Sequence, residues 1–176
     1  AGDGWTLAGI ESLPFPPGTM TALGERLEQV GDEDREILLC CAILGTKFAV
    51  APIADLLERE PIQVDLRLRV LERRHRLVLH ESDGYRFDQP VTRNLLLESI
   101  DPAERAALHL RAALGLQERS GVAPGVEQSA DLSYHYAEAA RPREALPYAI
   151  RVGSLLHDAA KPDESLKWLQ KAQTML

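Results

Sequence analysis

The stretch LVLHESDGYRF, residues 77–87, decides the expected fold. Residues 77–80 and 85–87 are short runs with the apolar and aromatic content of β-strands, and Asp83-Gly84 lies between them. Asp-Gly is a strong signal for a tight hairpin, because glycine tolerates the backbone angles that such turns need. The stretch therefore predicts a two-stranded hairpin in a chain whose other segments read as helices.

Helical patterns precede this hairpin. Apolar residues recur with the helical period in residues 19–30, 32–45, 51–59 and 61–77. In the last of these, Val64, Leu68 and Leu71 form the expected buried stripe, which Leu66, Val70 and Leu77 are expected to widen. Three short helices followed by a hairpin is the order of a winged-helix domain, which we place at residues 32–100. Residues 1–31 are then a linker and a first helix.

Short helices also follow the hairpin. Residues 90–100 return to a helical pattern, and Asp101-Pro102-Ala103-Glu104 is a strong start signal for a helix that runs to about residue 118. Residues 120–129 are loop-like in composition. Beyond them, Arg141-Pro142 and Lys161-Pro162 separate short helices in which small and large side chains alternate. We expect a tetratricopeptide-like array over residues 101–176, and the fold class is mainly α.

Composition and charge narrow the function. The chain has 176 residues and a net charge of −7, so no overall charge draws it to nucleic acid or to an anionic membrane. No apolar run approaches the ~20 residues of a membrane span, and we expect a cytoplasmic protein without a membrane partner. Cys40 and Cys41 are adjacent and point about 100° apart on a helix, so they are expected to be reduced core thiols. The missing initiator Met and the helical pattern at the end suggest a piece of a longer protein.

Motifs for chemistry are lacking. The sequence has no phosphate-binding loop, no dinucleotide-binding glycine motif and no metalloprotease motif. The five histidines lie at no metal-ligand spacing, and His135 is expected to be a packing or hydrogen-bonded residue. We therefore expect no catalytic residue, no metal and no bound cofactor in this segment.

Two sets of residues are candidates for an interaction surface. Arginines cluster just before the hairpin, where a DNA-binding winged helix has its recognition helix: Arg67, Arg73, Arg74 and Arg76. They suit either a DNA groove or a protein interface, and we favour a solvated or docking face. Aromatic residues in the array could line a peptide-binding groove: Tyr134, Tyr136, Tyr148 and Trp168.

The chain also resembles a known family. The segments GERLEQVGDEDREILLCCAILGTKF, VLERRHRLVLHESDGYRFDQPVTRNLLLESIDPAERAALH and DLSYHYAEAARPREALPYAI, in this order, resemble the region after the nucleotide-binding domain of bacterial STAND-class signal-transduction ATPases. These include large LuxR-type regulators and ATPase parts attached to cyclases or kinases. The resemblance implies an upstream domain that binds ATP or ADP, a winged helix that relays its state, and repeats that sense a protein or a small-molecule inducer. Any contact with DNA would then belong to an output domain.

The same resemblance singles out the end of the hairpin. Many relatives have Phe-x-His-Pro there, with a histidine that approaches the nucleotide phosphates, whereas this chain has Phe87-Asp88-Gln89-Pro90. Gln89 can donate a hydrogen bond but carries no charge. Arg93, one turn later, is either a substitute near the nucleotide or a partner for Glu98.

The leading hypothesis is a non-catalytic regulatory fragment of a larger ATP-dependent signalling protein, bound to its own upstream ATPase domain. The alternatives are a DNA-binding winged-helix regulator and a peptide-binding repeat scaffold.

Overall fold

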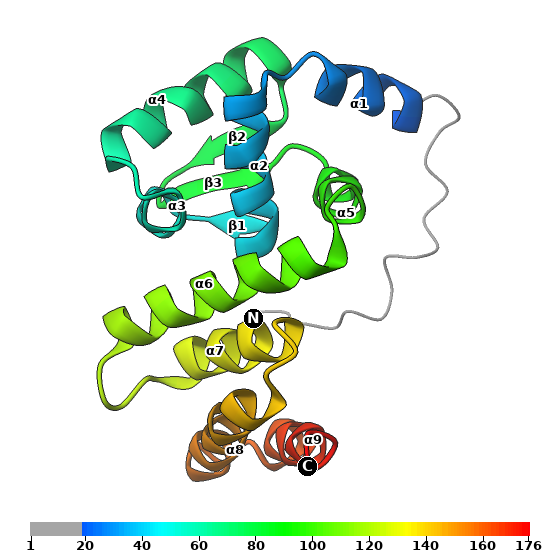
Figure 1. Ribbon diagram of the computed structural model, residues 1–176. Coiled ribbons are helices and arrows are strands. Elements are labelled where there is room, and N and C mark those ends of the chain that lie inside the picture. Colours follow the sequence, from blue (N-terminus) through cyan, green and yellow to red (C-terminus); the bar gives the residue numbers. More distant parts are fainter. Residues whose placement is uncertain (1–18) are drawn as a thin grey trace.

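The computed structural model describes residues 19–176, and the linker expected before residue 19 lies outside them. This part of the chain is mainly helical, with nine α-helices and a small three-stranded antiparallel sheet (Figure 1). The elements are α1 (Thr19–Glu28), α2 (Asp32–Leu44), β1 (Lys47–Phe48), α3 (Val50–Leu57), α4 (Pro61–Val70), a π turn (Leu71–His75), β2 (Val78–Glu81), β3 (Gly84–Phe87), α5 (Pro90–Glu98), α6 (Pro102–Ser120), α7 (Val126–Glu138), α8 (Pro142–Asp158) and α9 (Pro162–Gln173).

Helix α2 is the centre of the first half of the fold. It contacts β1, α3, α4, α5 and α6. Ile37, Leu38 and Ile43 are fully buried, as are the two free thiols of Cys40 and Cys41, which confirms the prediction that both are core residues. Burial of the Cys40 thiol raises its pKa to about 12, so it stays protonated. Three acidic residues occupy the first turn of α2, where they favour the helix dipole.

The sheet contains the predicted hairpin and one strand more. β2 and β3 pair with the register Val78 to Phe87 and Glu81 to Gly84, and β1 adds to the other edge of β3. This third strand of two residues was not predicted. It also explains why position 84 must be glycine: a Cβ atom there would lie 2.5 Å from the carbonyl oxygen of Phe48 in β1. The Asp-Gly signal thus serves both the turn and the close approach of β1.

Helix α4 and the π turn after it bury the predicted apolar stripe, but the buried stripe contains fewer residues than the sequence predicts. Val64, Leu68 and Leu71 are fully buried, as is Leu77 beyond the helix. The side chains of Leu66 and Val70 are 56% and 38% exposed, so the expectation that they widen the buried face is wrong. The reason is geometric: at about 100° per residue, positions 66 and 70 lie on the opposite side of the helix from 64, 68 and 71.

Helices α6 to α9 pack consecutively, each against the next. The predicted start of α6 is confirmed, because the Asp101 side chain accepts a hydrogen bond of 2.8 Å from the Ala103 amide. Helix α7 begins at Val126, so the loop predicted over residues 120–129 is too long. Gly125 is only the residue before the helix, and its amide donates to the side chain of Gln128.

The turns between α7 and α8 and between α8 and α9 have the same geometry, 20 residues apart. Ala140 and Ala160 have left-handed backbones with φ of 55° and 57°. The next amides, of Arg141 and Lys161, each donate a 2.9 Å hydrogen bond to the carbonyl five residues before them. This pattern is the Schellman motif, and each turn is followed by a proline at the first helical position.

Small residues let the helices of the array approach closely, as the sequence predicts. Ala145, Ala149 and Ser165 are buried between neighbouring helices. A Cβ atom on Gly153 of α8 would lie 2.7 Å from a methyl carbon of Leu169 in α9. Among the described helices, none is long and apolar enough to cross a membrane.

Replacing Ala140 by glycine should raise the free energy of unfolding by about 1 kcal/mol, because glycine adopts positive φ without the steric penalty of a Cβ atom. Ala130→Gly, inside α7, is the matched control and should lower it by about 1 kcal/mol. Urea unfolding followed by circular dichroism measures both. A loss of stability in both variants would contradict the left-handed turn.

Candidate functional site

The two halves of the chain meet where α6 crosses α2 and α3. Helix α6 contacts both of these helices, and its buried Ala112 joins the core that surrounds α2 (Figure 1). Leu108, one turn earlier on α6, packs against the same core. We call this contact, together with the side chains that tie α5 to α7, the junction.

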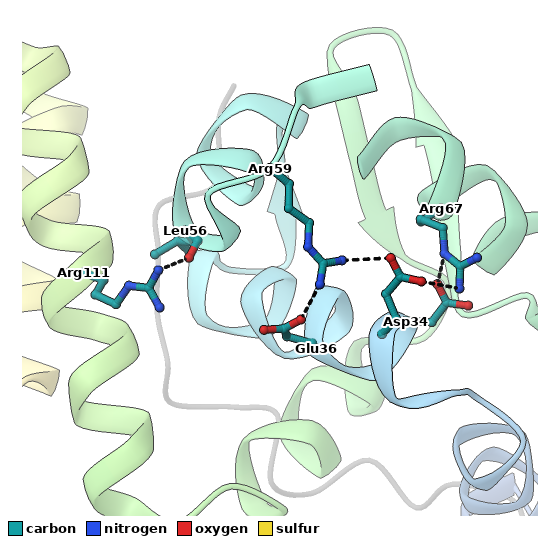
Figure 2. A network of polar contacts seen from close by, with 7 residues as sticks. Asp34, Glu36, Leu56, Arg59, Arg67 and Arg111 are labelled. Carbon is teal, nitrogen blue, oxygen red and sulfur yellow. Dashed lines mark hydrogen bonds and ion pairs between the residues drawn. The ribbon is translucent and has the colours of Figure 1, made fainter. Parts of the chain in front are cut away.

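Arginines of α6 bind the exposed end of α3. The guanidinium of Arg111 donates to the carbonyl oxygen of Leu56 (Figure 2). It also lies 3.4 Å from a carboxylate oxygen of Glu58. Two turns further along α6, Arg119 forms an ion pair with Asp55. The last carbonyls of a helix lack partners within it and carry partial negative charge, so a cation is favoured there. Ion pairs and apolar packing therefore both hold α6 against the C-terminal end of α3.

Arg93 ties α5 to both halves. Its Nε atom donates a 2.8 Å hydrogen bond to the carbonyl oxygen of Ala42 in α2, and its Nη2 atom donates a 3.1 Å bond to the hydroxyl of Tyr134 in α7. The ion pair with Glu98 that the sequence left open is not formed. One guanidinium thus connects three helices that are far apart in the sequence.

Gln89 is one turn before Arg93, at the start of α5. Its backbone is extended, and its side-chain oxygen is buried without a hydrogen-bond partner among the described residues. Gln89 is therefore the residue before α5, and Arg93 lies in the first turn of that helix. The guanidinium of Arg93 is already bound to two acceptors within the protein.

A buried histidine pair lies beside Arg93, between α6 and α7. The Nδ1 atoms of His109 and His135 are 3.0 Å apart, so one ring donates a hydrogen bond to the other. The ring of Tyr134 packs edge-on against His109 at 5.5 Å. This confirms that His135 is a packing and hydrogen-bonded residue.

The environment keeps both rings neutral. Burial, the neighbouring His109 ring and the positive charge of Arg93 lower the pKa of His135 to about 3. Burial, with the charges of Arg105 and Arg93, lowers the pKa of His109 to about 4. Arg105 itself pairs with Glu138 across α6 and α7 at 2.6 Å.

The acidic first turn of α2 holds two more arginines. Arg67 of α4 donates a 2.7 Å hydrogen bond to the buried carboxylate of Asp34, and Arg59 bridges Glu33 and Glu36 at 3.1 and 2.8 Å (Figure 2). Arg67 is therefore a structural residue that fixes α4 on α2. Sequence reasoning missed this role because its partner lies 33 positions away.

The remaining residues of the two predicted interaction surfaces are the arginines after α4 and the aromatic residues of α7 to α9. Arg73, Arg74 and Arg76 are exposed near the π turn. Tyr136 is buried, donates a 2.5 Å hydrogen bond to Gln117 and stacks on Tyr148 with ring centres 5.9 Å apart. Trp168 is half-buried on α9 under the ammonium group of Lys171. The aromatic residues are thus distributed over α7, α8 and α9, and Tyr136 and Tyr148 are engaged with each other.

A hollow of about 480 Å³ lies between α3 and α6, next to the arginine ties. Its charged lining residues are Asp55, Glu58, Arg59, Glu60, Glu118 and Arg119. Within residues 19–176, no group of three or more metal-binding side chains is brought together. Four carboxylates and two guanidinium groups line the hollow, and both guanidinium groups already form ion pairs, Arg59 with Glu33 and Glu36 and Arg119 with Asp55.

Arg93→Met should lower the free energy of unfolding by about 2 kcal/mol, because two partners of a charged donor lose their hydrogen bonds. Arg143→Met is the matched control: Arg143 is exposed and forms no ion pair with a described residue, so its loss should change stability by less than about 0.5 kcal/mol. Urea unfolding of both variants measures the difference. Equal effects would contradict the role of Arg93 as a tie.

The histidine pair should make the fold sensitive to mild acid. Both pKa values are lower in the folded state, so the unfolded chain binds more protons between about pH 4 and the ordinary value near 6.5. Stability should therefore fall as the pH drops through this window, by at most about 1.4 kcal/mol per pH unit for each histidine. Urea midpoints at pH 7, 6 and 5 measure this. In His135→Asn the dependence should be weaker, and an unchanged slope in this variant would contradict the assignment.

No protein-family model matches the chain, and no curated protein or solved structure matches it either. Its function is therefore inferred from the geometry of the junction and the order of its elements.

Proposed function

We propose that this chain is a non-catalytic regulatory part of a larger ATP-dependent signalling protein of the STAND class. In this proposal a winged-helix domain, residues 32–100, lies between an upstream ATPase domain and a tetratricopeptide-like array, residues 101–176. It passes the nucleotide state of the ATPase to helices that bind a protein or a small-molecule inducer. ATP and ADP belong to the parent protein, and we place it in the cytoplasm.

The order of the elements supports the winged-helix assignment. Helix, strand, two helices and a hairpin follow one another from α2 to β3, and β1 closes the sheet on β3. The exposed hairpin turn of Ser82 and Asp83 is then the wing. The observed order contains one element more than the three helices and hairpin that the sequence predicts, namely the strand β1.

The array assignment draws support from the repeated turn. Helices α7, α8 and α9 each contact the next, and the two turns share their hydrogen bonds and left-handed alanines. Repeats of this kind contact only their neighbours along the array. Such an array offers a long surface for a partner.

The tie made by Arg93 carries the proposal. It joins the carbonyl end of α2, the helix α5 that leaves the wing, and α7 of the array. Any movement of α5 must either carry α7 with it or break a charged hydrogen bond. A relay needs this property, since a switch works through an interface with a small number of discrete arrangements.

The geometry favours this reading over direct nucleotide sensing by Arg93. Its guanidinium already has two protein acceptors, so binding a phosphate would require the tie to open. The side-chain oxygen of Gln89 is buried without a hydrogen-bond partner among the described residues, and its amide carries no charge to attract a phosphate. We therefore assign Gln89 and Arg93 to transmission and place the contacts to phosphate in the upstream domain.

The alternatives have less support. A DNA-reading α4 would need free donors along its exposed face, whereas Arg67 and Arg69 are paired with Asp34 and Asp65. The peptide-groove hypothesis needs accessible aromatic rings, whereas Tyr136 is buried. Of the four arginines that the DNA-binding hypothesis names, only Arg73, Arg74 and Arg76 are exposed without an ion pair to a described residue.

The first test is the size and nucleotide binding of the native protein. An antibody raised against residues 19–176 should detect a protein several times larger than 19.5 kDa in extracts of its own cells. That protein should be retained on immobilised ATP and released by free ATP, whereas the recombinant 176-residue chain should pass through.

A native mass near 19.5 kDa would overturn the proposal. So would ATP hydrolysis that stays with the recombinant chain through successive columns. Retention of the recombinant chain on ATP would move the nucleotide site into this segment.

A further inference from the structure

Helix α4 carries a second apolar stripe on the face opposite its buried one. Ile62, Leu66 and Val70 are spaced by four residues, and their side chains are 65%, 56% and 38% exposed. At about 100° per residue they lie within about 80° of one another and on the far side from Val64 and Leu68. We call these three residues the outer stripe. Single exposed apolar residues are ordinary on a surface, whereas contiguous exposed apolar residues are typical of interaction sites.

The position of α4 leaves this stripe accessible in the described part of the chain. Helix α4 packs mainly against α2, α3 and the π turn that follows it, and its Asp65 accepts a 2.7 Å hydrogen bond from the Tyr85 hydroxyl of β3. It lies at the outer edge of the molecule, away from the array of α6 to α9 (Figure 1). A partner could therefore bind along α4 without displacing any described element.

Charge around the outer stripe is uneven. Arg69, beside the stripe, pairs with Asp65 at 2.8 Å, and Arg67 pairs with Asp34 on the other flank, so the sides of the stripe are neutralised. At its C-terminal end, Arg73 and Arg74 are exposed and form no ion pair with a described residue. Both arginines belong to the π turn Leu71–His75, which directly follows Val70. The stripe thus ends in two free positive charges.

We infer that α4 docks an amphipathic helix of a partner protein, whose apolar side chains cover Ile62, Leu66 and Val70 and whose acidic side chains meet Arg73 and Arg74. This is a helix-on-helix mode, in which apolar anchors one turn apart give affinity and flanking charges give direction. The inference rests on the outer stripe and these two arginines, and it does not depend on the proposed ATPase parent.

Two other occupants fit less well. A second copy pairing through α4 would bury two helices of only about 15 Å each. A stable dimer needs about 800 Å² from each partner, which such short helices do not supply. Nucleic acid would meet the apolar side chains of the stripe where it requires hydrogen-bond donors. An acidic helix satisfies both the apolar and the charged residues.

The test uses the 176-residue chain and a displayed library of 16-residue helical peptides. Each peptide carries leucines one turn apart, and its flanking positions vary among Glu, Gln and Lys. Selection should enrich Glu over Lys, and the enriched peptide should bind the chain in a fluorescence anisotropy titration. Leu66→Asp should weaken this binding at least tenfold. In Arg73→Glu/Arg74→Glu the preference should reverse towards Lys.

Ile150→Asp is the matched control, because Ile150 is also an exposed apolar helical residue, 45% exposed on α8. It should leave the binding unchanged. Leu66 is exposed, so Leu66→Asp should unfold at the urea concentration of the parent chain, which separates lost binding from lost folding.

Three results would overturn the inference. The first is no enrichment, or enrichment that Leu66→Asp does not affect. The second is a dimer in solution, by light scattering, that Leu66→Asp converts to a monomer; this would assign the stripe to a second copy. The third is binding of duplex DNA that is lost in Arg73→Glu/Arg74→Glu and kept in Leu66→Asp; this would assign the arginines to nucleic acid.

Discussion

The burial of α2 is the constraint on which the other elements depend. Seven of its thirteen residues are buried, and five other elements pack around it. An α-helix surrounded on nearly all sides cannot rotate or slide without opening the core, because protein interiors are close-packed. Every partner of α2 is therefore placed relative to the others through it.

Polar contacts then fix both ends of this helix. At its start, the buried carboxylate of Asp34 receives Arg67 from α4. At its end, the carbonyl oxygen of Ala42 receives Arg93 from α5. Apolar packing alone tolerates many arrangements of similar free energy, whereas a buried polar group without its partner is costly. These two arginines therefore select one arrangement of α4 and α5 around the same core.

Sequence reasoning succeeded where the signal is local. The hairpin follows from Asp83-Gly84, and the start of α6 follows from Asp101-Pro102, because each depends on a short run of residues with defined backbone preferences. Strand β1 could not be found, since two residues carry no periodicity. The sequence predicts the start of α7 too late, because the stretch rich in Gly and Pro that ends at Gly125 masks the first helical residues after it.

The site was predictable only in part, for a different reason. The expectation that Gln89 and Arg93 lie near a nucleotide stays a prediction, and the acceptors of Arg93 within the protein lie 51 and 41 positions away in the chain. The pairing of Arg67 with Asp34 has the same long-range character. In contrast, the outer stripe is visible in the sequence. In PIQVDLRLRV every second residue from Ile62 to Val70 is apolar. Residues two positions apart on a helix are separated by about 200°, so these apolar residues fall on two opposite faces. The pattern alone does not say which of the two faces is buried, because both are apolar.

The repeated turn gives the helices from α7 to α9 a regular arrangement. Because Ala140 and Ala160 give the same backbone path, the step from α7 to α8 and the step from α8 to α9 begin from the same local geometry. Arg93 holds α7, the first helix of this series. If α7 tilts by a few degrees, the far end of the series is displaced by an amount that grows with each added helix. In the proposed function, the array would then work as a lever.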